Sequence, residues 1–211
     1  MVTVSLPPLA TVAHLEAHLD RSLPAAQAEL AIRRASAQVR KYTRQTITLV
    51  EDDQVEVAGG ERVLRVPQRP LVVDADHPLT VVELGDFGGL DYTLVEGRDY
   101  ERLGNELTRG YPYHPPGRLM GWPWGRVRGV WAPRVRLTYS HGHAEVPDDI
   151  LDVVLDLAAM TVSNPENLRV EQIEDYSRTY STETIGGAAL TADHKEVLRA
   201  YRGGVSSVRL A

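Results

Sequence analysis

One apolar stripe constrains the fold of this chain more than any other feature. From Pro147 onward, apolar residues and one threonine recur at helical spacing, at Ile150, Val153, Val154, Leu157, Ala158 and Thr161. Leu151, Leu155 and Val162 widen this stripe, which predicts a helix with most of its surface buried. We expect this helix to be the core of the fold, with other helices covering it.

Three further helices are predicted, two before this one and one after it. The first runs from Leu9 to Leu19, and the second begins at Pro24, where a helix needs no N–H donor. In the second helix, apolar residues recur at intervals of four, three, four and three positions, at Ala28, Ile32, Ala35, Val39 and Tyr42. A last helix is predicted from Thr191 to about Tyr201, and Gly203-Gly204 ends it.

The middle of the chain has a different period. Short β-branched or apolar runs, mostly separated by Gly, Pro, Asp or Asn, predict a mostly antiparallel β region over residues 46–140. These runs are Ile47 to Val50, Val55 to Val57, Val63 to Val66, Leu79 to Leu84, Tyr92 to Val95 and Val135 to Tyr139. Gly59-Gly60 fits a hairpin turn between two of them. The expected fold class is α+β, with a small helical bundle from residues 1–45 and 141–211 and the β region inserted between them.

Residues 164–189 are polar and lack clear periodicity, which is typical of a functional or flexible segment. Within them, residues 170–173 and 179–182 are candidate arms of an extended hairpin. This segment also carries several acidic residues, including Glu171, Glu174 and Asp175.

The charges are segregated along the chain. A net charge of −6 over 211 residues argues against a protein built mainly to grip DNA phosphates. Residues 1–50 carry 6 basic and 3 acidic side chains, residues 51–108 carry 5 and 14, residues 109–136 carry 6 and 0, and residues 137–211 carry 6 and 12. This alternation predicts surfaces of opposite sign that meet copies of the chain or several partners.

Several function classes find no support in the sequence. The chain has no cysteine, which excludes disulfides, thiolate metal sites and cysteine nucleophiles. It shows no nucleophile elbow, P-loop or dinucleotide fingerprint, so we expect neither an enzyme nor a cofactor. We also expect no signal peptide, no transmembrane helix and no membrane partner.

One weak metal candidate remains at residues 141–149. His141 and His143 lie two residues apart, and Glu145, Asp148 and Asp149 follow. Two imidazoles and a carboxylate at one strand end can hold a metal ion, which leaves a metal-dependent enzyme as an alternative. The same residues also fit a simple turn from strand to helix.

A second unusual segment, Gly121 to Trp131, holds all three tryptophans within its eleven residues. Trp122, Trp124 and Trp131 alternate with arginines, among them Arg126 and Arg128, and with no acidic residue. Trp and Arg are enriched in interface hot spots and also suit base stacking and phosphate contact. The alternatives are a protein-contact loop, a loop folded back onto its own sheet, a nucleic-acid contact, and a glycan- or surface-binding site of a virion accessory protein.

The order of elements resembles the head-to-tail connector (adaptor, or head-completion) proteins of tailed bacteriophages. The resemblance is carried by VRKYTRQ at 39–45, LRVPQRPLV at 64–72, VRLTYSHG at 135–142, VPDDI at 146–150 and the closing helix at 190–202. His143 departs from the aromatic residue often found there, and the tryptophan segment has no counterpart in the family.

The resemblance implies a structural virion protein at the head–tail junction, assembled in the bacterial cytoplasm. It would form a ring, typically of twelve copies, between the portal and the next neck protein, a stopper or tail terminator, with double-stranded DNA passing through without specific binding. By position, the portal-facing residues would be Leu198, Tyr201, Arg202, Val208, Arg209 and Leu210. Because acidic walls repel phosphate, we expect Asp149, Asp152 and Asp156, or Glu171, Glu174 and Asp175, to face the channel.

Overall fold

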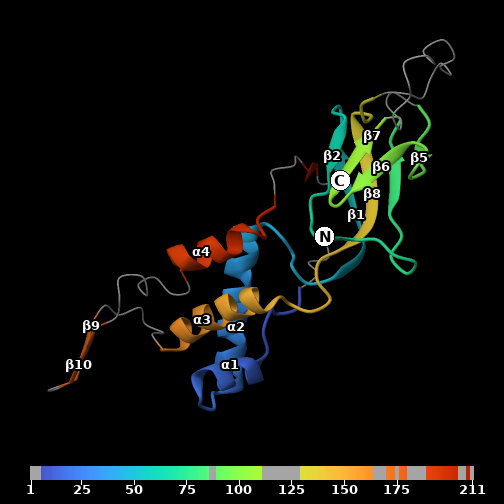
Figure 1. The fold of residues 1–211 in the computed structure, drawn as a ribbon. Helices are drawn as coiled ribbons and strands as arrows, with labels where there is room; N and C mark the ends of the chain where they lie inside the picture. Colours follow the sequence, from blue (N-terminus) through green and yellow to red (C-terminus); the bar gives the residue numbers. More distant parts are fainter. Residues whose placement is uncertain are drawn as a thin grey trace, which may run out of the picture. The chain divides into compact units, whose positions relative to one another are not determined.

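The computed structural model describes residues 6–85, 89–110, 129–163, 170–173, 176–179, 189–203 and 208–209. The chain divides into two compact units, which we call the helical unit (Met1–Thr48 with His143–Arg202) and the β-unit (Leu49–Gly142 with Gly203–Ala211). Figure 1 shows helices in the first and sheets in the second. The predicted α+β class is confirmed.

The helical unit contains α1 (Val12–Leu19), α2 (Ala25–Thr43), α3 (Asp148–Ser163) and α4 (Ala192–Arg199). Local sequence explains their starts. The Thr11 hydroxyl accepts the His14 backbone N–H at 3.2 Å, and Thr191 and His194 form a reciprocal capping box at α4. Asp148 and Asp149 lie in the first turn of α3, where negative charge is favourable.

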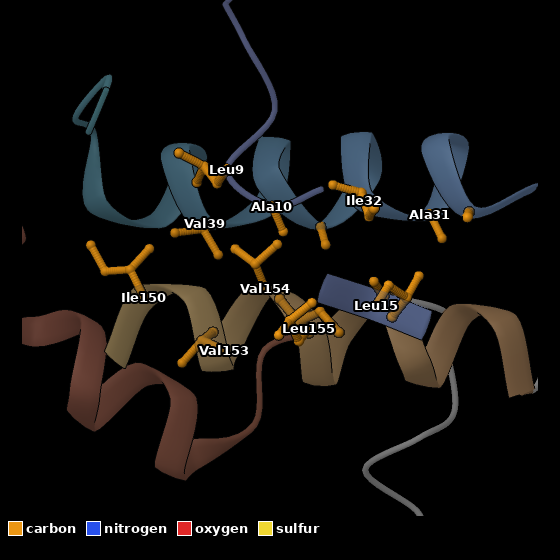
Figure 2. Packing of buried hydrophobic residues seen from close by; sticks show 14 of the residues in the cluster. Leu9, Ala10, Leu15, Ala31, Ile32, Val39, Ile150, Val153, Val154 and Leu155 are labelled. Atoms are coloured by element: carbon orange, nitrogen blue, oxygen red, sulfur yellow. The ribbon is translucent and has the colours of Figure 1, made fainter. Parts of the chain in front are cut away.

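The predicted apolar stripe is the buried face of α3. Ile150, Val154 and Leu157 are fully buried there. Figure 2 shows Ile32 and Val39 of α2 pointing toward α3, with Leu15 of α1 in the same cluster. These side chains form one continuous core, so burial of their apolar surface stabilises the helical unit.

The β-unit contains two antiparallel sheets. In the first, the order is β11 (Val208–Arg209), β1 (Val50–Ala58), β8 (Arg134–His141), β4 (Thr80–Glu83) and β5 (Tyr92–Leu94), and β3 (Leu71–Val72) also pairs with β8. The second places β7 (Glu106–Arg109) between β2 (Val63–Arg65) and β6 (Tyr100–Leu103). Alternating residues of β8, namely Val135, Leu137 and Tyr139, lie fully buried in a second core.

The predicted hairpin at Gly59-Gly60 is wrong. Strand β1 pairs with β8 and β11, and β2 pairs with β7. The N–H of Gly59 donates to Pro133 O and that of Gly60 to Trp131 O, both at 3.0 Å. A Cβ at Gly59 would overlap the Ala132 carbonyl oxygen, so this glycine permits a close approach of two segments rather than a tight turn.

The polar segment holds a short hairpin, as its sequence predicts in part. Strand β9 (Val170–Ile173) pairs antiparallel with β10 (Tyr176–Thr179), with Ile173 opposite Tyr176. The second arm therefore begins three residues earlier than predicted. Among the described helices, none is long and apolar enough to cross a membrane.

Candidate interaction surfaces

The end of the last helix is fixed to the helical unit by polar contacts. The Tyr201 hydroxyl donates to the Asp149 carboxylate, with 2.8 Å to each oxygen. The Arg202 guanidinium lies 5.6 Å from the ring centroid of Tyr42, and the Tyr42 hydroxyl donates to Lys195 O at 3.2 Å. Tyr201 and Arg202 are therefore held in defined positions at the surface, as residues that contact a partner must be.

Leu198 has a different position from the one predicted. Its side chain is fully buried in the core of the helical unit, where α4 packs against α2 and α3. Leu198 therefore holds the helix in place and does not lie on a portal-facing surface, which corrects the prediction for this residue.

The Tyr201–Asp149 contact gives a pH-dependent prediction. Burial, and then the hydrogen bond to Asp149, raises the pKa of Tyr201 to about 12, against roughly 10 for a free tyrosine. Because the folded pKa is raised, the contact stabilises the fold fully below the unfolded pKa and is lost as the pH rises from about 10 to about 12. Site-specific ¹³C NMR of the ring should show no phenolate of Tyr201 at pH 10.

The matched comparison for this measurement is Tyr100. Its pKa is also raised to about 12, first by burial and then by Glu96, and it has no part in the Asp149 contact. In Asp149→Ala the pKa of Tyr201 should fall but stay above about 10, because burial, the larger cause, remains, while that of Tyr100 stays unchanged. Equal titration of Tyr201 in the variant and the parent chain would show that Asp149 does not hold it.

The predicted acidic stripe of α3 divides into residues with different environments. Asp149 is exposed and binds Tyr201, and Asp152 is exposed on the same helix. Asp156 lies 3.3 Å from His18 Nε2 of α1 and 3.5 Å from His194 Nε2 of α4. Because His194 Nδ1 accepts the Thr191 N–H at 3.4 Å, its Nε2 is the nitrogen that donates to Asp156. Asp156 thus joins three helices.

An exposed basic face lies on α2 in the same unit. Arg33, Arg34 and Lys41 are exposed, because the opposite face of α2 packs in the core through Ile32, Ala35 and Val39. The helical unit therefore carries a basic surface on α2 and an acidic surface on α3, formed by Asp148, Asp149 and Asp152.

Trp131 lies in the core of the β-unit. Its side chain is 1% exposed, and its Nε1–H donates to Leu107 O at 3.2 Å. The Tyr100 ring lies 5.9 Å away and the Arg109 guanidinium 6.0 Å away, measured to ring centroids. This corrects the prediction that Trp131 is an interface residue, and it agrees with the alternative of a segment folded back onto its own sheet. Trp122, Trp124, Arg126 and Arg128 lie outside the described residues.

Beside Trp131 the β-unit buries an ion pair. Arg109, 5% exposed, lies 3.1 Å from Glu83 through Nε–Oε1 and 3.3 Å through Nη2–Oε2, and its Nη1 also donates to Asp99 O. Glu83 Oε1 accepts the Ala132 N–H at 3.0 Å. Parallel N–H···O bonds of this kind fix an arginine side chain geometrically, so the pair connects β4, β7 and the segment before β8.

The two histidines of the metal candidate have separate partners. His141 is fully buried, with its Nε2 3.1 Å from Asp53 Oδ2 and its ring 5.1 Å from that of Tyr139. The ring of His143 contacts the Tyr201 ring edge-on at 6.2 Å. In the part of the chain that the structure describes, no group of three or more His, Asp or Glu side chains is arranged to hold a metal ion. The residues form a turn from strand to helix.

The last predicted site residues lie at the chain end and in the polar segment. Val208 and Arg209 form β11 on the edge of β1, and Glu171 lies on β9. Leu210, Glu174 and Asp175 lie outside the described residues.

Comparison with known proteins shows where this fold occurs elsewhere. No protein-family model and no curated protein matches the chain. Among solved structures, it matches a chain of the structure "Neck of empty GTA particle computed with C6 symmetry", a GTA being a gene transfer agent, which is a phage-like particle. The TM-score is 0.52 at 16% sequence identity, over 96% of this chain and 94% of the other. The chain shares its fold with a particle-neck chain.

Sequence reasoning missed several contacts on these surfaces. Tyr42 and Asp149 hold the end of α4 through hydrogen bonds. From the sequence, Tyr42 was expected in an apolar core stripe and Asp149 in an acidic stripe facing the channel. The first half of strand β1 was also missed. Its four acidic residues within 51–56 were interpreted as turn residues, because acidic side chains are unfavourable in most strands.

Proposed function

We propose that the chain is a structural component of the neck of a phage-like particle, where it forms a ring beneath the portal that joins head to tail and continues the DNA channel. One observation carries this proposal: the match to the neck chain extends over 96% of this chain and 94% of the other, so both units are included. The resemblance of the sequence motifs to connector proteins points to the same role.

The charged faces of the helical unit support self-association. A cyclic ring uses two unlike surfaces of one chain, and these must be complementary. The exposed basic face of α2, with Arg33, Arg34 and Lys41, and the exposed acid Asp148 at the start of α3 meet this need. The matched neck was computed with sixfold symmetry, which is compatible with rings of six or of twelve copies, and twelve is the number we propose.

A chain with a net negative charge suits a channel through which DNA must pass without being bound. Binding to DNA phosphates releases counterions, so basic walls retain DNA and acidic walls repel it. We propose that Asp149 and Asp152 face the channel, together with Glu171, Glu174 and Asp175 of the polar segment. Asp156 contributes less because it is engaged with His18 and His194.

We also propose which residues contact the partner proteins. Tyr201 and Arg202 are the portal-facing residues we propose, because their contacts with Asp149 and Tyr42 hold them at the helix end. Trp122, Trp124, Arg126 and Arg128 are proposed to contact an acidic surface of a neighbouring subunit or of the stopper or tail-terminator protein.

Deleting the gene in the particle-producing strain tests this role. We expect filled or leaking heads without tails alongside free tails, because the neck cannot be completed, and electron microscopy of lysates with a titre of infectious or transducing particles measures this. Supplying the chain from a plasmid should restore tailed particles. Normal tailed particles from the deletion strain would refute a role in joining head to tail.

A further inference from the structure

Two large apolar side chains are exposed among the described residues of the helical unit, and they lie on different helices. Leu30 of α2 is 47% exposed, and Val197 of α4 is 41% exposed. A single exposed apolar residue is common on protein surfaces and needs no partner to explain it. The residues around Leu30 and Val197 therefore decide whether these positions belong to an interface.

Leu30 lies at the centre of the exposed face of α2. Residues three or four positions apart are neighbours on a helix surface, which places Arg33 and Arg34 beside Leu30 and Ala37 in line with it. All four side chains are exposed, whereas Ile32 on the other side of α2 points toward α3 (Figure 2). The exposed face of α2 thus has an apolar centre with two guanidinium groups next to it.

Val197 has a charge of the opposite sign beside it. By the same spacing, Asp193 lies one turn before Val197 and Ala200 about one turn after it, and all three side chains are exposed. The cations of α4, Lys195 and Arg199, are each two positions from Val197, and residues at that spacing do not share a helix face. The exposed face of α4 around Val197 is thus apolar and acidic.

The charged groups beside the two apolar side chains are available to a partner. Among the described residues, Arg33, Arg34 and Asp193 take part in no ion pair, whereas Glu196 of α4 lies 3.2 Å from Arg199. Complementary charges across an interface steer association and set its register. The distance between two packed helices depends on the side chains at their contact, so small residues such as Ala37 and Ala200 permit a close approach.

The two faces cannot meet within one chain. Helix α4 is held to α2 through Tyr42, whose hydroxyl donates to Lys195 O at 3.2 Å. Tyr42 packs against the core of the helical unit, so α4 lies on the core side of α2 and not on the side that carries Leu30. A contact between the two faces therefore needs a second copy of the chain.

We propose that in the assembled ring the α2 face around Leu30 packs against the α4 face around Val197 of a second copy of this chain. This inference rests on the ring proposed above. Leu30 and Val197 would remove each other's apolar surface from water, and Arg33 or Arg34 would pair with Asp193. Because the two faces are unlike, each copy contacts one neighbour through α2 and the other through α4, which is the heterologous contact that a cyclic ring requires.

Cross-linking with introduced cysteines tests the contact, because the chain has no cysteine of its own. One chain carries both Ala37→Cys and Ala200→Cys, which leave Leu30, Val197 and the charged side chains in place. This chain replaces the parent chain in the particle, and purified particles are treated with a short bis-maleimide reagent. We expect a ladder of covalent dimers, trimers and larger multimers of this chain on a denaturing gel.

Three chains serve as controls for the ladder. Each single-cysteine chain, Ala37→Cys or Ala200→Cys, should remain monomeric, because a heterologous contact brings two unlike positions together. The matched double variant Ala37→Cys/Lys195→Cys moves the second thiol to the other side of α4 and should also remain monomeric.

A charge exchange tests the proposed ion pairs. Arg33→Glu/Arg34→Glu should lower the titre of tailed particles, because like charges then face each other across the contact. Adding Asp193→Arg to the same chain should restore part of the titre, since every copy then carries reversed charges on both faces. Equal thermal unfolding midpoints of the isolated chains separate a lost contact from a folding defect. Chains that fold equally but show no restoration would overturn the pairing with Asp193.

Three cross-linking results would overturn the contact as a whole. These are a double-cysteine chain that stays monomeric in particles that contain it, a single-cysteine chain that forms a dimer, and a link to a different protein. Each of them leaves the proposed function intact, because the chain is still part of the particle. Particles that lack even the parent chain would instead contradict the proposed function.

Discussion

Replacing Trp131 with alanine is expected to lower the free energy of unfolding of the β-unit by about 3–5 kcal/mol. The indole is 1% exposed and packs against Tyr100, and its N–H bonds to Leu107 O. Removing it leaves a cavity and also leaves a buried carbonyl without its donor. Amide hydrogen exchange of β8 measures the effect, because β8 lies at the centre of the β-unit and reports the opening of this unit alone.

Two variants control this result. Trp131→Phe retains an aromatic ring but loses the N–H donor, so its effect should be smaller, about 1–3 kcal/mol. Leu103→Ala removes an apolar side chain that is 81% exposed and should change stability by about 0.5 kcal/mol or less. If Trp131→Ala kept the stability of the parent chain and lost only particle assembly, Trp131 would be a contact residue after all.

The second large effect is expected for Glu83→Ala. This change leaves the Arg109 guanidinium, 5% exposed, without its carboxylate in the interior of the β-unit. Removing one partner of a buried ion pair costs about 3–5 kcal/mol, and the Ala132 N–H loses its acceptor as well. The urea midpoint for the loss of hydrogen-exchange protection in β7 and β8 measures this.

An exposed ion pair in the sheet that also contains Arg109 provides the control. Arg65 and Glu106 lie 2.9 Å apart, with 62% and 43% of their side chains exposed, so Arg65→Ala should cost about 1 kcal/mol or less. The double variant Glu83→Leu/Arg109→Met should recover part of the stability lost in Glu83→Ala, because it removes the buried charge of Arg109 as well as that of Glu83. A double variant that is no more stable than Glu83→Ala would show that the charge pair is not the cause.

The helices could be predicted closely because periodicity and capping residues act locally. Three predicted helix starts lie within about one turn of those observed, and they were predicted from Pro24, from Thr191 and from the apolar stripe that begins at Ile150. Strands β6 and β7 were missed because β6 exposes Leu103 and β7 buries the charged Arg109, which hides their alternation. Strand pairing depends on contacts between distant residues, and so the sequence around Gly59-Gly60 predicted a local hairpin that does not form.

The candidate surfaces were predictable to a smaller extent. Residues 1–50 carry more basic than acidic side chains, and Arg33, Arg34 and Lys41 lie on the exposed face of α2 because its opposite face carries the apolar stripe. Trp131 and Leu198 could not be assigned correctly, since sequence shows that a side chain is apolar but not whether its own core or a partner covers it. The β1–β11 pairing joins residues about 150 positions apart, which no local pattern can indicate.

The most direct test of the central claim is electron cryo-microscopy of the native particle, with the neck averaged both with and without imposed symmetry. We predict a closed ring of this chain between portal and tail, with density for its helical unit and its β-unit in every subunit. A neck whose density accommodates no copy of the chain, or a particle that carries the chain on its outer surface, would contradict the account.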